Sequence, residues 1–439
     1  MKNNSVYAII IDTMSVDTIL QQYDRFGIDL GLDRVFSLLA KLGNPHDRVP
    51  IIHVAGTNGK GSVCAYLSSV LTTAGYRTGR YTSPHLIDWC ERICINEKPI
   101  ASSILERLLL EIETAIADDP TPTQFELFTV AAWLYFAREN VDIAVMEVGL
   151  GGRLDATNVC DRPLVTAITS IGMDHWQQLG ETLSDIATEK AGILKRDRPL
   201  VVGNLPPEAE NAVRKRIEET NCPAVWTTAA MERETASHPD GLRSLSYHNI
   251  DYQIPLLGEF QRINSAIAID ILLQLRQQGF NLPDTAIQAG MSRTKWPGRM
   301  QWVTWRDRRI LIDGAHNAAA AKMLRSYVEI LPTPVTWVMG MLATKDCVGI
   351  FKALLREGDR LFLVPVPNAN SANLEELEKL ANKVCPQLQQ CKSYLELESA
   401  LEVAVQGDRP IVLCGSLYLV GSFFSRGDSR ITPTLYPFH

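Results

Sequence analysis

The sequence lacks the features that mark disulfide-rich, membrane-spanning and repetitive proteins. Its nine cysteines include no Cys-x-x-Cys pair, and no internal repeat or low-complexity segment is present. No apolar run reaches the roughly 18 residues that a membrane-spanning helix needs. Scattered cysteines in apolar surroundings are typical of reduced core residues, and the apolar run near the N-terminus is too short for a secretory signal. We therefore expect a cytoplasmic protein.

Long runs of basic residues are absent as well. The 439 residues carry 43 Lys and Arg against 50 Asp and Glu, which gives a net charge of −7. This balance leaves no broad basic surface, so we expect no nucleic-acid partner and no membrane partner. Cys90 and Cys94 lie near His85, but their spacing fits no common zinc pattern. An anionic ligand would need basic side chains gathered at one point.

What the sequence does contain is apolar segments that alternate with helical patterns. Hydrophobic residues make up 46% of the chain, and its length predicts two or three domains. Continuous apolar strands separated by helices indicate a doubly wound, mainly parallel sheet. The expected strands are Pro50–Ala55, Val141–Val148, Leu164–Thr169 and Pro199–Val202, and the expected helices are Lys60–Ala74, Gln124–Arg138 and Glu181–Lys195.

A second unit follows a break in this pattern at Pro297-Gly298. Before the break, Leu242–Ile254 alternates polar and apolar residues, which predicts a short antiparallel addition, and a helix is expected at about 262–278. After it we expect strands at Met300–Trp305, Arg309–Asp313, Val335–Met339, Leu361–Val366 and Pro410–Cys414. The sequence thus predicts an α/β protein with a doubly wound domain over residues 1–297 and a smaller Rossmann-like domain over residues 298–439.

A glycine-rich segment directly follows the first of these strands. It reads Gly56-Thr57-Asn58-Gly59-Lys60-Gly61-Ser62 and leads into a helical pattern. Such a turn points several backbone N–H groups and the positive end of the helix dipole at one spot, which suits a phosphate group. Lys60 adds a positive charge, and Ser62 offers a hydroxyl near a metal ion. The glycine spacing is shorter than in the standard P-loop, so we interpret the segment as a variant; the alternative is a turn that binds nothing.

Two further polar residues follow later strands of the predicted sheet. Glu147 ends a strand that would be buried on both faces, where a carboxylate is costly unless a cation pairs with it. It is therefore a metal-ligand candidate, against the alternative of a surface charge at the strand end. His175 comes after the next strand, at the edge of the sheet where ligands of open α/β sheets bind. A lone histidine is more often structural, so both interpretations stay open.

Several motifs together resemble folylpolyglutamate synthases. They are 53–62 (His-Val-Ala-Gly-Thr-Asn-Gly-Lys-Gly-Ser), 82–85 (Thr-Ser-Pro-His), 147–158 (from Glu147 to Asn158), 189–193 (Glu-Lys-Ala-Gly-Ile) and 313–317 (Asp-Gly-Ala-His-Asn). Bacterial members of this family often double as dihydrofolate synthases, and the family belongs to the ATP-dependent ligases that include the cell-wall Mur enzymes. The resemblance implies a P-loop, Mur-ligase-like N-terminal domain and runs over nearly the whole chain.

The resemblance implies amide formation driven by ATP. A carboxylate of dihydropteroate or of a reduced folate takes the γ-phosphoryl group, and the amino group of L-glutamate then displaces phosphate from the acyl phosphate. Three alternatives remain: a monofunctional folylpolyglutamate synthase, a P-loop regulatory ATPase, and a cell-wall Mur ligase. The Mur ligase would need a uridine-nucleotide domain ahead of Gly56, for which we expect too few residues. The regulatory ATPase would hydrolyse ATP without regard to folate or glutamate.

By similarity to the family, Ser83, Glu147 and His175 hold Mg²⁺, with two ions expected. Magnesium suits the task because it bridges phosphates with few protein ligands. The family's matching lysine is carbamylated, which implies a carbamate on Lys190. From the sequence alone Lys190 is a helix lysine, and such residues usually face solvent. Lys60, Lys190 and His316 are the expected catalytic residues.

The resemblance also assigns residues to the substrates and to ATP. Thr123, Phe125 and Glu126 match the pteroate-binding segment, although Thr-x-x-Glu is also a helix capping box. The other expected substrate-binding residues are Asp29, Arg153, Leu154, Asp155, Ala156 and Ser416. Asn264 is expected near the adenine, and Arg299 and Asp313 near the phosphates and ribose, with helix-terminal roles as the alternative for Asn264 and His316. We expect a monomer that binds small molecules only.

Overall fold

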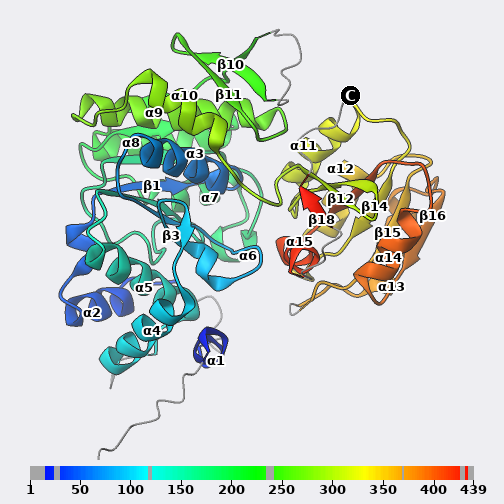
Figure 1. The fold of residues 1–439 in the computed structure, drawn as a ribbon, viewed down its shortest axis with the longest axis horizontal. Coiled ribbons are helices and arrows are strands. Elements are labelled where there is room, and N and C mark those ends of the chain that lie inside the picture. The colour runs from blue at the N-terminus through cyan, green and yellow to red at the C-terminus, as the bar shows by residue number, and fades with distance from the viewer. Residues whose placement is uncertain are drawn as a thin grey trace, which may run out of the picture.

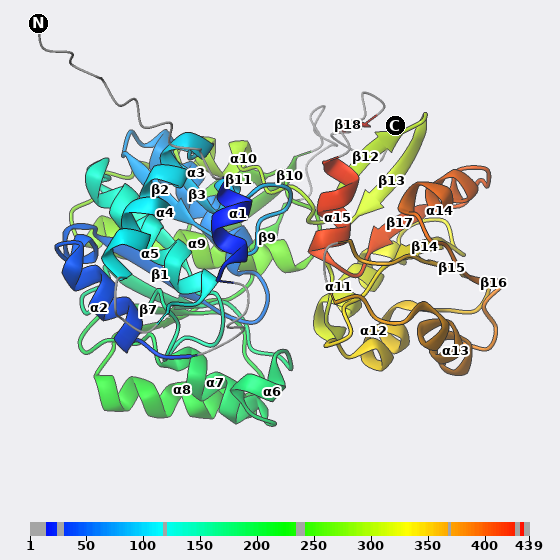
Figure 2. The same ribbon diagram turned by 90° about the horizontal axis from the view of Figure 1, so that it is seen from below.

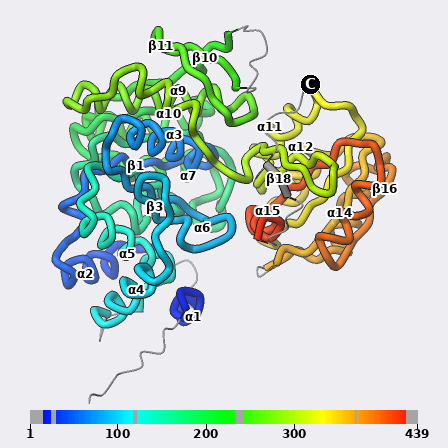
Figure 3. The backbone as a smooth tube through the Cα atoms, viewed as in Figure 1, coloured from blue at the N-terminus to red at the C-terminus, as the bar shows by residue number. Residues whose placement is uncertain are grey.

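The computed structural model describes residues 15–23, 30–116, 121–233, 242–367, 370–425 and 431–433. The predicted substrate residue Asp29 lies outside these ranges. Two lobes are visible in Figure 1, one coloured blue to green and the other yellow to red. We call them the N-terminal lobe, which holds the elements up to α10, and the C-terminal lobe, which begins with β12. The tube in Figure 3 follows the same division.

An eight-stranded sheet forms the centre of the N-terminal lobe. The strands from β2 to β8 in its order run parallel, and β3 and β4 add an antiparallel edge. All five residues of β1 are buried. Because β1 pairs with β5 on one side and β6 on the other, its carboxyl end lies between the carboxyl ends of these two strands. In order across the sheet the strands are β4 (Lys98–Pro99), β3 (Ile93–Ile95), β2 (Thr78–Tyr81), β5 (Ile143–Glu147), β1 (Ile51–Ala55), β6 (Val165–Ile168), β7 (Leu200–Val202) and β8 (Ala224–Trp226).

Helices cover both faces of this sheet, as a doubly wound fold requires. Alternate residues of β1 enter different cores: Ile51 packs in one, and Ile52 and Val54 in another. The second of these cores lies under α3 (Lys60–Thr73), α9 (Phe260–Gln277) and α10 (Asp284–Arg293). The opposite face carries α1 (Val16–Gln21), α2 (Asp33–Lys41), α4 (Ser102–Ile116) and α5 (Gln124–Arg138), with α7 (Leu183–Ala191) and α8 (Pro207–Thr220) over β6 and β7.

A three-stranded antiparallel sheet packs beside α10. It consists of β9 (Met231–Glu232), β10 (Arg243–Tyr247) and β11 (Ile250–Ile254). The alternating pattern at 242–254 therefore forms the hairpin that the sequence predicts. Short elements complete the lobe: η2 (Pro45–Arg48), η3 (Trp89–Arg92) and α6 (Trp176–Leu179).

The C-terminal lobe is a seven-stranded sheet with helices on both faces, seen from another side in Figure 2. Among the described strand pairs of this sheet, β12–β13 and β12–β18 are antiparallel and the others are parallel. One face packs against α11 (Ala318–Val328), α12 (Cys347–Leu354) and α13 (Leu374–Val384), and the other against α14 (Leu397–Ala404) and α15 (Leu417–Phe424). In order the strands are β16 (Gln390–Ser393), β15 (Arg360–Leu363), β14 (Thr336–Met339), β17 (Ile411–Cys414), β13 (Arg308–Ile312), β12 (Gln301–Trp305) and β18 (Ile431–Pro433).

The α/β fold class is thus confirmed, with one helix shorter than predicted. The pattern at 181–195 gives α7 only over Leu183–Ala191. Thr182 caps its start by accepting from the backbone of Asp185, and Gly192 ends it. In the described part of the chain no helix has the length and apolar character that crossing a membrane requires.

Candidate active site

The glycine-rich segment closes the gap between β1 and α3. Thr57 N donates to Ser170 O at 2.7 Å, and Asn58 N donates to Ser170 Oγ at 3.0 Å, so the end of β6 holds the loop in place. Gly59 is required by its positive φ of 88° and by its neighbour, since a Cβ there would meet Asn264 Oδ1 at 2.5 Å. Lys60 folds back over the loop and donates from Nζ to Gly56 O at 3.0 Å. The loop is therefore preformed around its own lysine.

Residues from both lobes gather around this loop in one cavity of about 400 Å³. Asn264 projects from α9 and is buried. Asp313, at the end of β13, accepts from Met300 N at 2.9 Å and from Ala315 N at 2.8 Å. Burial raises the pKa of Asp313 above its usual value, and the nearby Arg299 opposes this shift only in part. The predicted nucleotide-site residues that line this cavity are Gly56, Thr57, Asn58, Gly59, Lys60, Gly61, Ser62, Asn264, Arg299 and Asp313.

The four predicted metal residues line the same cavity. Glu147 is 4% exposed, and its Oε2 accepts from Ser83 N at 3.2 Å. Burial raises the pKa of Glu147, and Lys60 opposes this shift. No side-chain cation lies within ion-pair distance of Glu147 in the described residues. A buried carboxylate of this kind fits a cation that the protein does not itself supply.

His175 and Lys190 complete this set. Desolvation lowers the pKa of His175 to about 4 against the opposing effect of Asp174, so its ring is neutral and able to ligate. Lys190 is buried in α7 and does not face solvent. Its burial, with Lys60 nearby, lowers its pKa to about 7. The described ranges hold no group of three or more His, Cys, Asp or Glu side chains placed to bind a metal together.

Asp174 connects the two lobes at this point. Its Oδ1 accepts from Lys345 Nζ at 2.7 Å and its Oδ2 from Asn317 Nδ2 at 3.0 Å, both from the C-terminal lobe. Burial raises the pKa of Asp174, but His316 and Lys345 outweigh that effect and lower it well below its usual range. The side chain is therefore a carboxylate that fastens α11 and the segment after β14 to the edge of the first sheet.

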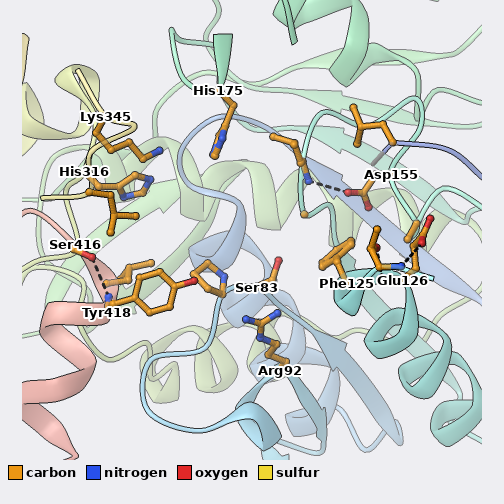
Figure 4. A pocket seen from close by; sticks show the side chains of 18 of the residues that line it. Ser83, Arg92, Phe125, Glu126, Asp155, His175, His316, Lys345, Ser416 and Tyr418 are labelled. Atoms are coloured by element: carbon orange, nitrogen blue, oxygen red, sulfur yellow. Dashed lines mark hydrogen bonds between the residues drawn. The ribbon is translucent and has the colours of Figure 1, made fainter. Parts of the chain in front are cut away.

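A second cavity of about 390 Å³ lies beside the first and is drawn in Figure 4. One end is built by the N-terminal lobe and presents Phe125, Glu126 and Asp155. The other end is built by the C-terminal lobe and presents His316, Lys345, Ser416 and Tyr418. The predicted substrate residues that line this cavity are Thr123, Phe125, Glu126, Leu154, Asp155, Ala156 and Ser416.

The segment at the start of α5 has both of the roles that its pattern allows. Thr123 and Glu126 form a capping box: Glu126 N donates to Thr123 Oγ1 at 3.2 Å and Thr123 N to Glu126 Oε2 at 2.7 Å. Arg34 also pairs with Glu126 at 2.9 Å, so this carboxylate is neutralised inside the protein. Phe125 is left as the member of the segment that offers an apolar face to the cavity.

Arg153 is placed differently from the other predicted substrate residues. Its side chain is 54% exposed and pairs with Glu189 at 2.9 Å, and it is not among the residues that line either cavity. The second cavity also has lining residues that the sequence did not predict, among them Arg92, Lys345 and Tyr418. Arg92 belongs to η3, a short turn with no sequence signature for binding. Lys345 carries a recognisable signal, because it follows a parallel strand at its carboxyl end.

The two cavities meet at one place. Ser83, His175 and His316 line both of them. Ligands in the two cavities would therefore share these three residues as neighbours. This arrangement suits transfer between a nucleotide and a second ligand.

Comparison with known proteins agrees with this geometry. The Mur ligase middle domain family matches residues 54–272, and the C-terminal domain family of dihydrofolate synthetase matches residues 299–425. The dihydrofolate synthetase of Saccharomyces cerevisiae is 35% identical over 92% of this chain and 99% of its own. The dihydrofolate synthase/folylpolyglutamate synthase of Escherichia coli is 33% identical over 92% of each chain. A solved Escherichia coli structure in complex with DHPP and ADP superposes with a TM-score of 0.82 at 30% identity, over 95% of this chain and 98% of its own.

The fold and the loop define a P-loop protein of the Mur ligase class. Within that class, the chain belongs to the dihydrofolate synthase/folylpolyglutamate synthase family.

Proposed function

We propose that this protein is an ATP-dependent amide ligase that adds L-glutamate to dihydropteroate, to the glutamyl tail of reduced folates, or to both. The observation that best supports this proposal is that the two cavities meet at Ser83, His175 and His316, which line both of them. We call this place the junction. An acceptor carboxylate at this junction lies beside the phosphates of a nucleotide held by the loop. Its oxygen attacks the γ-phosphorus and ADP leaves; the amine of glutamate then attacks the acyl carbon, phosphate leaves, and the amine loses a proton.

The loop at 56–62 and Lys60 bind the ATP phosphates in this proposal. Asn264 lies at the adenine, and Arg299 and Asp313 at the phosphates and ribose. The nucleotide then spans both lobes, which explains why the cavity draws residues from α9 and from the end of β13. The ammonium group of Lys60 donates to Gly56 O and Thr57 O, which leaves its third proton for a phosphate oxygen.

Ser83, Glu147, His175 and Lys190 are the residues that would hold magnesium, with two ions expected. Magnesium shields the negative charge of the phosphates and of the approaching carboxylate. The depressed pKa of Lys190, about 7, leaves a reactive neutral fraction near neutral pH, which supports a carbamate formed with CO₂. The carbamate would convert a buried cation into an anion in the cavity that Glu147 also lines.

The acceptor's flat ring system is proposed to lie at the Phe125–Asp155 end of the second cavity. Aromatic stacking on Phe125 and the apolar surfaces of Leu154 and Ala156 suit a planar heterocycle. The incoming glutamate lies at the other end, near Ser416 and His316, where Lys345 adds a positive charge. Arg153 would act only through its pairing with Glu189. Because both ends come from one chain, a monomer is sufficient.

The two domains are proposed to divide at residues 297 and 298. Gly298 has a φ of 73° and its backbone N donates to Gln301 Oε1 at 3.0 Å, which sets a tight turn directly before β12. A turn of this kind at the linker allows the lobes to close on substrate.

The test is phosphate release from MgATP and L-glutamate with dihydropteroate or tetrahydrofolate as the acceptor, with each product checked by mass for one added glutamyl unit. Turnover with both acceptors supports the bifunctional enzyme. Turnover with tetrahydrofolate alone narrows the proposal to a folylpolyglutamate synthase. Phosphate release that ignores both acceptors would overturn the ligase and favour a regulatory ATPase.

A further inference from the structure

A chain of three buried side chains connects the central strand to the second cavity. His53 lies in β1, Thr157 in the loop after β5, and Asp155 at the cavity wall. His53 Nε2 is 2.8 Å from Thr157 Oγ1, and Thr157 Oγ1 is 2.5 Å from Asp155 Oδ1. Their exposed fractions are 1%, 0% and 2%. None of these contacts is made by a residue of the phosphate loop.

The protons in this chain have one consistent order when Asp155 is ionised. A carboxylate only accepts hydrogen bonds, so Thr157 must donate its single hydroxyl proton to Asp155. The hydroxyl oxygen then accepts from His53, which fixes the ring as the Nε2–H tautomer. Burial lowers the pKa of His53 to about 3, with Lys195 adding to the effect, so the ring is neutral as this order requires.

Asp155 is held from its protein side by further donors. Thr157 N donates to Oδ1 at 3.1 Å, and Leu150 N donates to Oδ2 at 2.8 Å. Burial raises the pKa of Asp155, these hydrogen bonds oppose that shift, and they fix the plane of a carboxylate that lines the second cavity. A carboxylate oriented in this way suits a heterocycle edge that offers adjacent N–H donors, such as an aminopyrimidine.

We propose that His53 and Thr157 are positioning residues that orient the Asp155 carboxylate toward the N–H edge of the acceptor heterocycle. The inference rests on the proposed function, because it assigns that end of the cavity to the acceptor. Neither residue touches the acceptor. His53 and Thr157 affect how strongly the acceptor binds, and they do not affect the nucleotide site.

The first experiment replaces the hydroxyl with a methyl group in Thr157→Val. The acceptor KM should rise about ten- to hundredfold, which is the usual effect of losing a hydrogen bond to a charged group. The KM for MgATP should stay within about twofold. Thr157→Ser restores the hydroxyl and should restore the acceptor KM. The matched control is Thr227→Val, which removes a similar buried hydroxyl that donates to Asp270 Oδ2 at 2.7 Å, away from both cavities.

A double-mutant cycle separates positioning from general packing. In an Asp155→Ala background, Thr157→Val should add little to the acceptor KM, because the carboxylate on which Thr157 acts has gone. His53→Gln retains an N–H donor and should bind acceptor nearly as well as the wild type, whereas His53→Leu should not.

The outcomes of these experiments distinguish the proposed ligase function from the positioning role of His53 and Thr157. If the wild type turns over neither acceptor, the proposed function fails. If the wild type turns over an acceptor but Thr157→Val leaves its KM unchanged, or raises the KM for acceptor and MgATP equally, the positioning role is overturned and the chain is only structural. Full additivity with Asp155→Ala would overturn it as well.

Discussion

Asn58 of the phosphate loop and Asn317 at the start of α11 face each other across the two lobes. Asn317 Nδ2 donates to Asn58 Oδ1 at 3.1 Å, while Asn317 Oδ1 accepts from Ala320 N at 2.9 Å and so caps α11. One side chain therefore ties the helix of the C-terminal lobe to the loop of the N-terminal lobe. The contact therefore joins the phosphate loop directly to the C-terminal lobe.

Asn317→Asp should weaken catalysis without removing the helix cap. The new carboxylate still accepts from the backbone of α11, but it loses the donor to Asn58 and to the Asp174 carboxylate, which it now repels. We expect kcat/KM to fall about ten- to hundredfold, which corresponds to one lost hydrogen bond to a charged group. Asn373→Asp is the matched control, because Asn373 caps α13 in the same way and lines neither cavity. Equal activity of both variants in a phosphate-release assay would refute the link.

Lys190→Ala should lose activity, and short carboxylates such as acetate should partly restore it. The proposed carbamate supplies an anion, which a small carboxylate can replace in the space that alanine leaves. A loss of about a hundredfold is expected for a group that supports a metal site. Lys195→Ala, which removes a less buried lysine paired with Asp161 at 3.9 Å, serves as control. Crystal density that shows an unmodified Lys190 amine in the active, magnesium-bound enzyme would count against the carbamate.

Gly149→Ala should impair acceptor binding through Phe125. A Cβ at Gly149 would lie 2.3 Å from Phe125 Cζ, so the ring must move. We expect the acceptor KM to rise about tenfold, equivalent to the 1.4 kcal/mol that an aromatic contact of this kind contributes. Gly407→Ala, whose nearest neighbour would be 3.6 Å away, is the control. An unchanged KM would show that Phe125 does not contact the acceptor.

Replacing His53 should reduce the decrease in the free energy of unfolding that occurs as the pH is lowered. The folded-state pKa is about 3 and the unfolded value about 6.5. Between these values the unfolded chain binds a proton that the folded chain does not, so stability falls as pH decreases from 6.5. The slope from this one group is about 1.4 kcal/mol per pH unit. Urea unfolding of His53→Gln and the wild type at pH 7 and pH 5 should show a smaller difference for the variant; equal differences would contradict a neutral buried ring.

Local signals were sufficient to predict the central elements of the fold. Ile51–Ala55 is apolar apart from His53, Ile143–Glu147 is apolar up to its last residue, and Thr123 marks the start of α5 with a capping box. The strand Thr78–Tyr81 escaped prediction because it is short and carries Arg80. That arginine is accommodated by long-range partners, Glu97 at 3.7 Å and Cys94 Sγ at 3.3 Å, which no local pattern reveals.

The candidate site likewise has one part that the sequence predicts and another that it does not. The residues of the phosphate loop and Glu147 are contiguous with strands that the sequence predicts, so their placement at one sheet edge follows from topology. Lys345 and Asp174 meet only because the second lobe docks on the first, which sequence spacing does not determine. Arg153 lay in a strong motif, yet its neighbour Glu189 directs it away from the cavities.

The most direct test of the account uses an acceptor whose carboxylate carries ¹⁸O, incubated with MgATP and L-glutamate. If the acceptor carboxylate is phosphorylated before the amine attacks, the released phosphate must carry one ¹⁸O from that carboxylate, in step with amide formation. Phosphate without label would mean that water attacks ATP, and would contradict an acyl phosphate formed where the two cavities meet.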